Sequence, residues 1–324
     1  MSPIAHKPKV SIVMSFFDEP LQWIRLAIDS ILAQTLQDFE LLLICDNPEH
    51  DEAIRYVRNI ADRRIRLTIN AANIGPTKSF NIAIAQAQGE YIARMDADDI
   101  CLAERLEKQV AYLERHPEVS VCATNTHSID GKGKIIRRNR YDKKHDRALM
   151  FISNNIAHPT VMFRQSLLDI RKPLYNEEFI YSQDYELWQH LLLRGHLIHT
   201  LDEVLLLYRK TEEQISSAQK PLQTELFEKA QKSFISEWLS NHGIIRHEDR
   251  EDIHMMLKKA SCAYRSVPSK ELTHIIYALY LSLGRHELKY RFKYLWDSNL
   301  IVFRVRFIFT LRLLCAKKRP SLHK

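Results

Sequence analysis

Three carboxylates crowd four positions of this 324-residue chain, in the segment Asp96-Ala97-Asp98-Asp99. The segment follows the apolar run Tyr91–Met95 directly and precedes a helical pattern. Clustered like charges raise one another's pKa, and hard divalent cations prefer oxygen ligands. We therefore expect a Mg²⁺ or Mn²⁺ site that holds a diphosphate. The alternative is a helix N-cap with acids in the first turn, which accounts for Asp98 or Asp99 but hardly for all three acids.

Two further acids stand at the ends of predicted elements. Asp46 follows the apolar run Glu40–Cys45, so strand topology predicts it at the same sheet edge as the acidic cluster, where it would accept bonds from a base or ribose. Asp-Asn-Pro is also common turn chemistry, and that alternative stays open. Asp184 opens a helical pattern within Ser182–Trp188. A carboxylate at a helix start stays ionised, which makes Asp184 a candidate base, with an N-cap as the alternative.

Two basic residues are weaker candidates. Lys78, near Gly75, would meet a phosphate at the start of the following helix, whereas a solvated lysine is the alternative. His158, in Ile156–Thr160, lies between the two acidic segments, which permits a role at the site that they form. A histidine before proline is otherwise an ordinary loop residue.

Short apolar runs alternate with helical patterns over the first 130 residues. Strands are predicted at 10–15, 40–45, 65–69, 91–95 and 119–124, and helices at 21–32, 51–61, 79–87 and 102–114. This alternation predicts a parallel α/β sheet that binds ligands at the carboxyl ends of its strands, near a switch in strand order. Further along, the pattern indicates a helix at 184–193, a strand at 204–208 and helices from about Pro221 onward.

The charge is unevenly distributed. Residues 220–324 hold 20 Lys and Arg against 10 Asp and Glu, whereas residues 1–219 hold 27 against 30. Basic, aromatic and aliphatic residues interleave at 288–294 and 300–314, before the basic run at 317–319. This composition favours an anionic membrane surface as a partner, with packing against the preceding domain as the alternative. Nucleic acid ranks last because no RRM, KH, zinc or helix-turn-helix signature accompanies the charge.

Composition and cysteine usage point to a globular protein of a reducing compartment. Apolar residues make up 45% and charged residues 27%, which excludes wholesale disorder and fibrous or disulfide-scaffold classes. The five cysteines are scattered without a CxxC pair, and residues 1–13 have no secretory-signal pattern. No apolar run reaches the length of a membrane-spanning helix. We expect a cytoplasmic protein that docks through its basic tail on the inner face of the membrane.

Several blocks, in order along the chain, resemble the family 2 glycosyltransferases. They are VSIVMSFFD (10–18), SILAQTLQDFELLLICD (30–46), Asn73-Ile74-Gly75, Asn81, GEYIARMDADD (89–99) and QDYELW (183–188). The resemblance covers about residues 9–216 and implies a GT-A fold, which is a Rossmann-like, mostly parallel sheet flanked by helices. It implies a catalytic domain over 1–216, which leaves 217–324 as a basic helical extension.

The resemblance also implies an activity and a set of site residues. The activity is inverting transfer of a hexosyl or N-acetylhexosaminyl group from a UDP-sugar to a hydroxyl of a glycan or glycolipid, such as lipopolysaccharide or capsule. Asp184 is the implied catalytic base, and Asp98 and Asp99 are the implied metal ligands. The implied nucleotide-binding residues are Ser15, Phe17, Asp18, Asp46, Asn73, Gly75, Asp96 and Asp98. We add Lys78 to this set because of its place at the start of a helix. The acceptor-side residues are His158, Gln183 and Trp188.

Some positions depart from the family pattern. Asn47-Pro48 replaces the usual Gly-Ser, Cys45 replaces a common first acid, and Thr211 stands where a histidine often helps to bind metal. An inactive GT-A protein that binds a membrane or nucleic acid through its basic region is therefore the alternative function. Sugar-nucleotide synthesis and dinucleotide binding are disfavoured because the loop Ser15–Glu19 contains no glycine.

Overall fold

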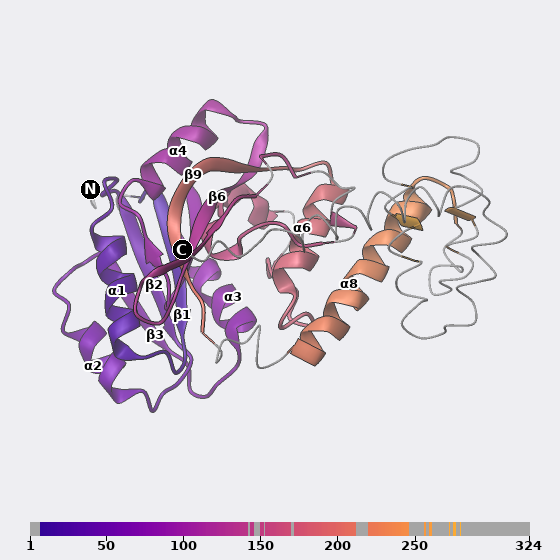
Figure 1. Cartoon of the computed structure of the whole chain (residues 1–324). Helices are drawn as coiled ribbons and strands as arrows, with labels where there is room; N and C mark the ends of the chain where they lie inside the picture. Colours follow the sequence, from indigo (N-terminus) through magenta and orange to yellow (C-terminus); the bar gives the residue numbers. More distant parts are fainter. Residues whose placement is uncertain are drawn as a thin grey trace, which may run out of the picture. The chain divides into compact units, whose positions relative to one another are not determined.

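The computed structural model describes most of the chain up to residue 245 (Figure 1). The described residues are 7–141, 143–145, 150–151, 153–169, 172–211, 220–245, 256, 259, 260, 272, 275, 276 and 279. The chain divides into two compact units. The first is made of residues 1–146 and 154–230, and the second of residues 147–153 and 231–324. The predicted domain boundary at 216/217 lies outside the described residues and stays a prediction.

The first seven elements alternate strand and helix. They are β1 (Val10–Phe16), α1 (Leu21–Leu32), β2 (Phe39–Cys45), α2 (Asp51–Arg58), β3 (Ile65–Ile69), α3 (Pro76–Gln86) and β4 (Tyr91–Asp96). The strands pair in parallel in the order β3-β2-β1-β4, as the alternation predicts. The helix α3 begins three residues earlier than predicted, because Pro76 occupies its first position, where a missing N–H costs nothing.

The next seven elements mix the two strand directions. They are β5 (Ile100–Cys101), α4 (Arg105–Arg115), β6 (Val119–Ile129), β7 (Ile135–Asn139), β8 (Met162–Arg164), α6 (Gln183–Leu193) and β9 (Leu197–Arg209). β8 is antiparallel to both β4 and β6, while β6 and β9 are parallel. The order is β3-β2-β1-β4-β8-β6-β9-β5, and β7 pairs with β6. The sequence pattern missed β8 because three residues are too few for a periodicity.

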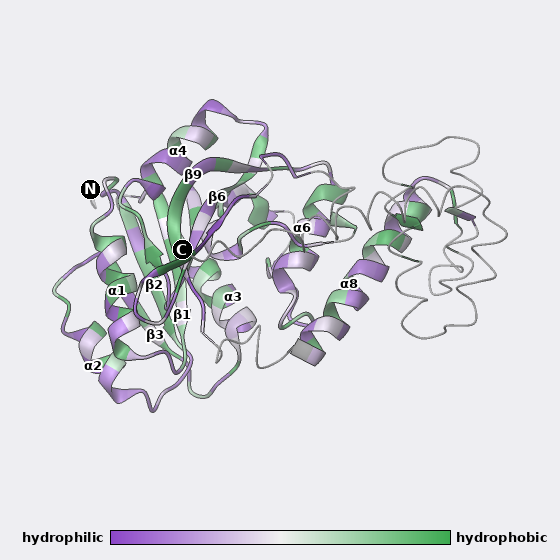
Figure 2. Cartoon of the chain, in the orientation of Figure 1, coloured by the Kyte–Doolittle hydropathy of each residue, from purple (hydrophilic) through white to green (hydrophobic). Residues whose placement is uncertain are grey.

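Helices cover both faces of the parallel strands (Figure 1). Val10, Ile12 and Met14 of β1 share a buried cluster with Ile24 and Ile28 of α1. The helix α3 contacts β1 and β2 as well, from the other side of the strands. Burial on both faces explains why these strands are almost continuously apolar, as Figure 2 shows. Each fully buried aliphatic side chain contributes about 1.5–3 kcal/mol to stability.

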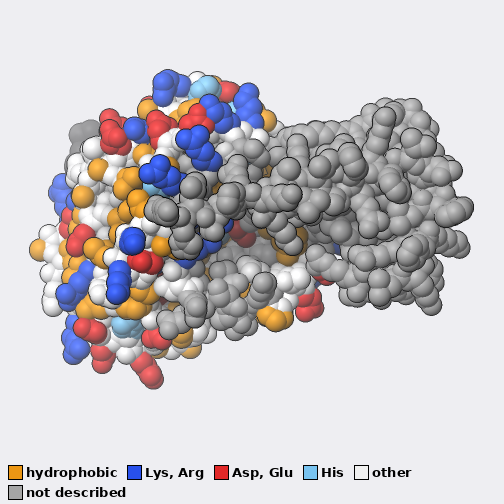
Figure 3. Space-filling view, in the orientation of Figure 1, with side chains coloured by type: hydrophobic (Ala, Val, Ile, Leu, Met, Phe, Trp, Pro, Cys, Tyr) orange, Lys and Arg blue, Asp and Glu red, His pale blue; other side chains and the backbone are white. Residues whose placement is uncertain are grey.

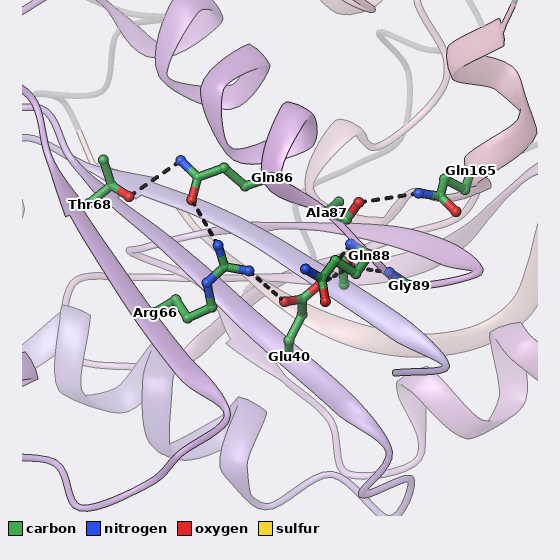
Figure 4. Close-up of polar contacts among 9 residues, drawn as sticks. Glu40, Arg66, Thr68, Gln86, Ala87, Gln88, Gly89 and Gln165 are labelled. Carbon is green, nitrogen blue, oxygen red and sulfur yellow. Dashed lines mark hydrogen bonds and ion pairs between the residues drawn. The ribbon is translucent and has the colours of Figure 1, made fainter. Parts of the chain in front are cut away.

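A polar network at the amino-terminal edge of the sheet sets where β4 begins. Ser11 Oγ donates to Glu40 Oε1 at 2.6 Å and accepts the N–H of Gly89 at 2.8 Å. Glu40 also accepts the N–H of Gln88 at 2.8 Å and pairs with Arg66 at 3.2 Å (Figure 4). A Cβ on Gly89 would lie 2.4 Å from the backbone nitrogen of Ser11, so this close approach requires glycine.

The helix α8 (Lys220–Asn241) agrees with the helical pattern predicted from Pro221. Within the second unit, the ring of Phe151 stacks on Phe234 with centroids 4.6 Å apart. Phe151 also meets Trp238 edge-on at 5.9 Å, so the C-terminal half of α8 contributes to a small aromatic core.

Most of the basic C-terminal region lies outside the described part of the chain. This holds for residues 288–294, 300–314 and 317–319, so their predicted docking on an anionic membrane stays a prediction. Among the described helices, none combines the length and the apolar character needed to cross a bilayer. Figure 3 shows Lys and Arg side chains mixed with Asp and Glu over the visible described surface.

Candidate active site

The strand order switches direction at β1. After β2 and β3 are added on one side of β1, the chain crosses to the other side to form β4. Ser15 near the end of β1 pairs with Asp96 of β4, and Phe16 pairs with Cys45, the residue before Asp46. Open α/β sheets bind ligands outside the carboxyl ends of the strands at such a switch. The predicted residues Ser15, Asp46 and Asp96 therefore lie at the edge where a ligand is expected.

The acidic cluster after β4 brings its carboxylates together. Asp96, Asp98 and Asp99 offer ligand atoms that all lie within 4.8 Å of one another. Asp99 is fully buried, and its Oδ2 atom has no hydrogen-bond partner. Burial, and then the charges of Asp98 and Asp96, raise the pKa of Asp99 well above its ordinary value of 3.8. A buried carboxylate oxygen without a donor is costly unless a proton or a cation meets it, so these residues fit a hard divalent cation.

Arg209, the last residue of β9, attaches that strand to the acidic cluster. Its backbone N–H donates to Asp99 Oδ1 at 2.8 Å, and its Nε donates to the carbonyl oxygen of Asp98 at 2.7 Å. The preceding residue, Tyr208, has its pKa raised by burial and by the three acids. Thr211, where the family pattern has a histidine, follows two residues after Arg209 and is partly exposed. The end of β9 thus reaches the acidic cluster.

Arg94 is a buried cation of this site that the sequence analysis did not single out. Its Nη2 pairs with Asp96 Oδ1 at 2.9 Å, and its guanidinium lies over the ring of Phe80 at 4.2 Å. The available signal was an arginine in the otherwise apolar strand β4, two residues before an acid. A buried guanidinium with a carboxylate partner holds that carboxylate in one orientation.

The loop after β1 contains an acid near the cluster, Glu19, that the sequence analysis did not single out. Phe17 and Asp18 are exposed, whereas Glu19 is partly buried and accepts the N–H of Phe17 through Oε2 at 2.7 Å. Burial and, more weakly, the charge of Asp96 raise the pKa of Glu19 above its ordinary value of 4.5. Glu19 is therefore the carboxylate of this loop that is electrostatically connected to the acidic cluster.

Asp46 holds the loop before α3 in place. Its Oδ1 accepts the side-chain amide of Asn70 at 2.7 Å and the N–H of Ile74 at 3.0 Å. Its Oδ2 accepts the N–H of Gly75 at 2.8 Å, and Gly75 has a φ of +87°, a value that favours glycine. Three donors leave little of the acceptor capacity of this carboxylate for a ligand. Its contacts thus support a positioning role for Asp46 as much as direct contact with a base.

Two other predicted residues of this loop lie at its surface. Asn73 is exposed, and its Oδ1 accepts the N–H of Gly75 at 3.0 Å. Lys78 is exposed in the first turn of α3, where the N–H groups of a helix start favour an anion. Both residues are therefore accessible to a nucleotide.

Asp184 lies in the first turn of α6 beside a second polar group. Its Oδ2 accepts the side-chain amide of Asn154 at 2.7 Å and lies 4.0 Å from His158 Nδ1. Burial raises the pKa of Asp184, against the N–H of Tyr185, the amide of Asn154 and the charge of Arg94, which lower it. The raised direction differs from the expectation of a helix-start carboxylate, because burial outweighs the helix N–H groups. The side chain remains 19% exposed, so a substrate hydroxyl has access to it.

Aromatic residues surround His158. Its Nε2 is hydrogen bonded to the Tyr175 hydroxyl at 2.8 Å, and its ring meets Trp188 edge-on at 5.9 Å. Burial and the charge of Arg94 lower the pKa of His158 well below 6.5, so the ring is neutral at pH 7. Trp188 is fully buried and packs against His158. Gln183 is also buried, and its Oε1 has no hydrogen-bond partner.

Asn81 connects the aromatic group to α3. Its side chain accepts the N–H of Tyr175 at 3.0 Å and donates to the carbonyl oxygen of the same residue at 2.9 Å. This two-way clamp fixes the loop that carries Tyr175 and thereby its contact with His158. The pattern of the sequence marks Asn81 as part of a block, but only the fold reveals its partner.

Comparisons with known proteins give one consistent family. The family model for glycosyl transferase family 2 matches residues 11–171. An uncharacterized glycosyltransferase of Methanocaldococcus jannaschii is 34% identical over 208 residues, which cover 63% of this chain and 71% of the relative. The O-antigen biosynthesis glycosyltransferase WbnJ of Escherichia coli is 32% identical over 207 residues, which cover 62% of this chain and 79% of the relative.

The fold has solved counterparts. The crystal structure of residues 1–349 of Staphylococcus aureus TarS in complex with UDP-GlcNAc superposes with a TM-score of 0.58. That likeness covers 86% of this chain and 87% of the other at 16% sequence identity, so it shows the fold. The predicted α/β architecture, with a mostly parallel sheet flanked by helices, is thereby confirmed.

Proposed function

The chain belongs to glycosyltransferase family 2, and on that premise we propose that it moves one sugar from a UDP-sugar to a hydroxyl of a glycan or glycolipid, with inversion at the anomeric carbon. One observation carries this proposal: two acidic groups share the first compact unit. The three carboxylates after β4 suit a nucleotide diphosphate with its cation, while Asp184 suits removal of a proton. Arg94 pairs with Asp96 and also acts on Asp184 electrostatically, so the two groups are connected.

The donor side is assigned to the loops that follow the first four strands. The crystal structure of TarS is a complex with UDP-GlcNAc, which supports a UDP-sugar as the donor class. The exposed ring of Phe17 offers a surface for a base, and α3 offers its helix start to phosphate. The proposed nucleotide-binding residues are Ser15, Phe17, Asp18, Asp46, Asn73, Gly75, Lys78, Asp96 and Asp98.

A divalent cation, Mg²⁺ or Mn²⁺, is part of the proposal. Asp98 and Asp99 would hold it together with Asp96, because their oxygens converge and one buried oxygen of Asp99 has no donor. When bound, the cation neutralises negative charge on the diphosphate as it leaves. The chain's own contribution is to hold these carboxylates rigid: Arg209 fixes Asp99 and Arg94 fixes Asp96.

Asp184 is the proposed general base. It removes the proton from the acceptor hydroxyl while that oxygen forms a bond to the anomeric carbon and the bond from this carbon to the diphosphate breaks. A single displacement from the face opposite the leaving group inverts the configuration. A raised pKa strengthens Asp184 as a proton acceptor, since base catalysis is most effective when the pKa approaches the working pH. Asn154 orients the carboxylate by donating to Oδ2.

The acceptor is proposed to be a surface glycan or its lipid-linked precursor. The name of WbnJ refers to O-antigen biosynthesis. A second relative, the amylovoran biosynthesis glycosyltransferase AmsE of Erwinia amylovora, is 29% identical over 210 residues, which cover 64% of this chain and 78% of the relative. His158 and Gln183 lie near Asp184 and are proposed for the acceptor side, with Trp188 supporting His158. The sugar transferred is proposed to be a hexosyl or N-acetylhexosaminyl group. The protein is proposed to act at the inner face of the cytoplasmic membrane.

Calorimetric titration tests the donor site. The purified chain is titrated with UDP, GDP and dTDP, with and without Mn²⁺, and Asp98→Ala is compared with Asp51→Ala, which removes an exposed acid of α2. We expect UDP binding that depends on Mn²⁺ and is lost in Asp98→Ala only. Binding of UDP without metal would point to the Thr211 position as the cause. If none of the nucleotides binds, the chain is the inactive GT-A protein and the proposal fails.

Asp184→Asn tests the catalytic step separately. The amide keeps the size of the side chain but cannot accept the proton, so we expect transfer to be lost while UDP affinity stays within about twofold of the original. Full transfer activity in this variant would refute the role of Asp184 without affecting the donor site.

A further inference from the structure

The turn before β7 and the strand itself form a basic, exposed segment, residues 131–140, here called the basic hairpin. It contains five cations and no acid: Lys132, Lys134, Arg137, Arg138 and Arg140. All five are exposed, and so are Ile135 (48%) and Ile136 (54%). No part of the proposed reaction uses this segment.

The geometry of β7 shows that its isoleucines have no core to cover. β7 pairs antiparallel with the end of β6, with Asn139 opposite Thr126 and Ile135 opposite Ile129. Side chains alternate across a strand, so Ile135 and Ile136 point to opposite faces. A strand that covered a core would bury one of them, yet both are about half exposed. Neither isoleucine of β7 is therefore buried as a residue facing a core would be.

The hairpin is held in shape by its own polar groups. Asp130 Oδ1 accepts the N–H groups of Lys132 and Lys134, each at 2.9 Å, so this carboxylate closes the turn. The side chain of Asn139 donates to Thr126 Oγ1 at 3.0 Å and to Ser128 Oγ at 2.9 Å, across to β6. Because the backbone of this segment is already ordered, the entropic cost of binding a partner is lower than for an unstructured segment.

Arg209 joins the base of the hairpin to the acidic cluster. Its Nη1 donates to the carbonyl oxygens of Asp130 at 2.9 Å and Gly131 at 3.2 Å, while its Nε donates to that of Asp98. Whatever surface the hairpin contacts is thus held at a set distance from the candidate active site.

We propose that the basic hairpin docks on a bilayer of anionic phospholipid. The cations would lie against lipid phosphates, and Ile135 and Ile136 would enter the headgroup region, as apolar residues of interfacial segments do. Five cations alone would equally suit a soluble polyanion, but two isoleucines exposed among them suit a surface with an apolar layer beneath its charges. The inference is independent of the proposed function, because docking requires neither donor nor acceptor.

Vesicle co-sedimentation of the full chain, without nucleotide, tests this inference. The vesicles consist of equal parts of phosphatidylcholine and phosphatidylglycerol, with pure phosphatidylcholine for comparison. Each Lys or Arg near an anionic surface changes binding about fivefold, so Arg137→Glu with Arg138→Glu is expected to weaken it at least about 25-fold. Ile135→Ser with Ile136→Ser is expected to weaken it about tenfold. The matched control, Arg58→Glu with Arg63→Glu, changes the net charge equally at exposed sites elsewhere and is expected to bind within about threefold of the original.

Each outcome decides the inference. Losses in both hairpin variants but not in the control support it. Equal binding by the hairpin variants and the control would overturn it, because another region, such as 288–319, would then carry the affinity. A loss with the glutamates but none with the serines would also overturn it, since Ile135 and Ile136 would then make no contact with the apolar layer of the bilayer. Thermal unfolding and UDP affinity are measured on every variant and should stay unchanged, because these side chains are exposed and outside the donor site.

Discussion

The backbone N–H of Arg209 donates a hydrogen bond to Oδ1 of Asp99 across 2.8 Å, although 110 positions separate the two residues in sequence. This bond joins the end of β9 to the loop that follows β4. It leaves the other oxygen of Asp99, Oδ2, buried and without a donor beside Asp96 and Asp98. The same arginine contacts the base of the basic hairpin, so one residue organises the acidic cluster and its surroundings.

Arg209→Lys should damage both stability and donor binding. A lysine cannot reproduce the separate Nε and Nη1 contacts of the guanidinium, so the partly buried hydrogen bonds to the carbonyl oxygens of Asp98, Asp130 and Gly131 are lost. We expect unfolding free energy to fall by about 3 kcal/mol and UDP affinity to fall at least about tenfold. Denaturant unfolding and calorimetry measure the two effects. Lys210→Ala, at the exposed neighbour, is the control, and equal behaviour of the two variants would contradict the role of Arg209.

Asp46→Asn should loosen the loop before α3. The amide can present only one acceptor oxygen, so its NH₂ group would face an N–H of Ile74 or Gly75. We expect a loss of stability of about 1–3 kcal/mol and a loss of UDP binding. Asn47→Asp, which keeps the side-chain oxygen that accepts the N–H of Glu49, is expected to retain both properties. Normal UDP binding by Asp46→Asn would exclude both the positioning role and a direct contact with the base.

The acid limb of the pH profile should report Asp184. The base works only when deprotonated, so kcat/KM should decrease as the pH falls through the raised pKa of this carboxyl group, above 3.8. Asn154 donates to the charged form and lowers that pKa, so Asn154→Ala should move the acid limb to higher pH. In Asn154→Ala, the plateau value of kcat/KM at high pH should change less than the pH at which the acid limb lies. The control is Asn59→Ala, at an exposed asparagine after α2, which should leave the acid limb in place. If the limb also stays in place in Asn154→Ala, the hydrogen bond from Asn154 does not control the pKa of Asp184.

Gly89→Ala should be strongly destabilising although it adds a single methyl group. The new Cβ would lie 2.4 Å from the backbone nitrogen of Ser11, and backbone cannot move aside as a side chain can. We expect a cost of about 3 kcal/mol. In Gly131→Ala the new Cβ would meet only Trp23, at 3.8 Å, so this variant should be close to neutral. Thermal or denaturant unfolding of the two variants measures this difference. Equal losses of stability in both variants would indicate a general effect of replacing glycine, not the close approach of Gly89 to Ser11.

The sequence by itself determined the parallel half of the fold and the position of the acids. Apolar runs such as 40–45 and the helical pattern of 21–32 are local signals, and parallel pairing follows because a helix lies between successive strands. Since the carboxyl ends of parallel strands share one edge of the sheet, the sequence alone places Asp46 and Asp96 at that edge.

Only the tertiary structure decided which side chains meet there. The bonds from Arg209 to Asp99, from Asn154 to Asp184 and from Asp46 to the loop at Gly75 join segments 28 to 110 positions apart, and periodicity carries no information about such pairs. The same holds for Glu19, which the fold places, partly buried, near Asp96 while it leaves Asp18 exposed. The strand β8 was also invisible, because three residues acquire their conformation from the neighbours with which they pair, not from their own pattern.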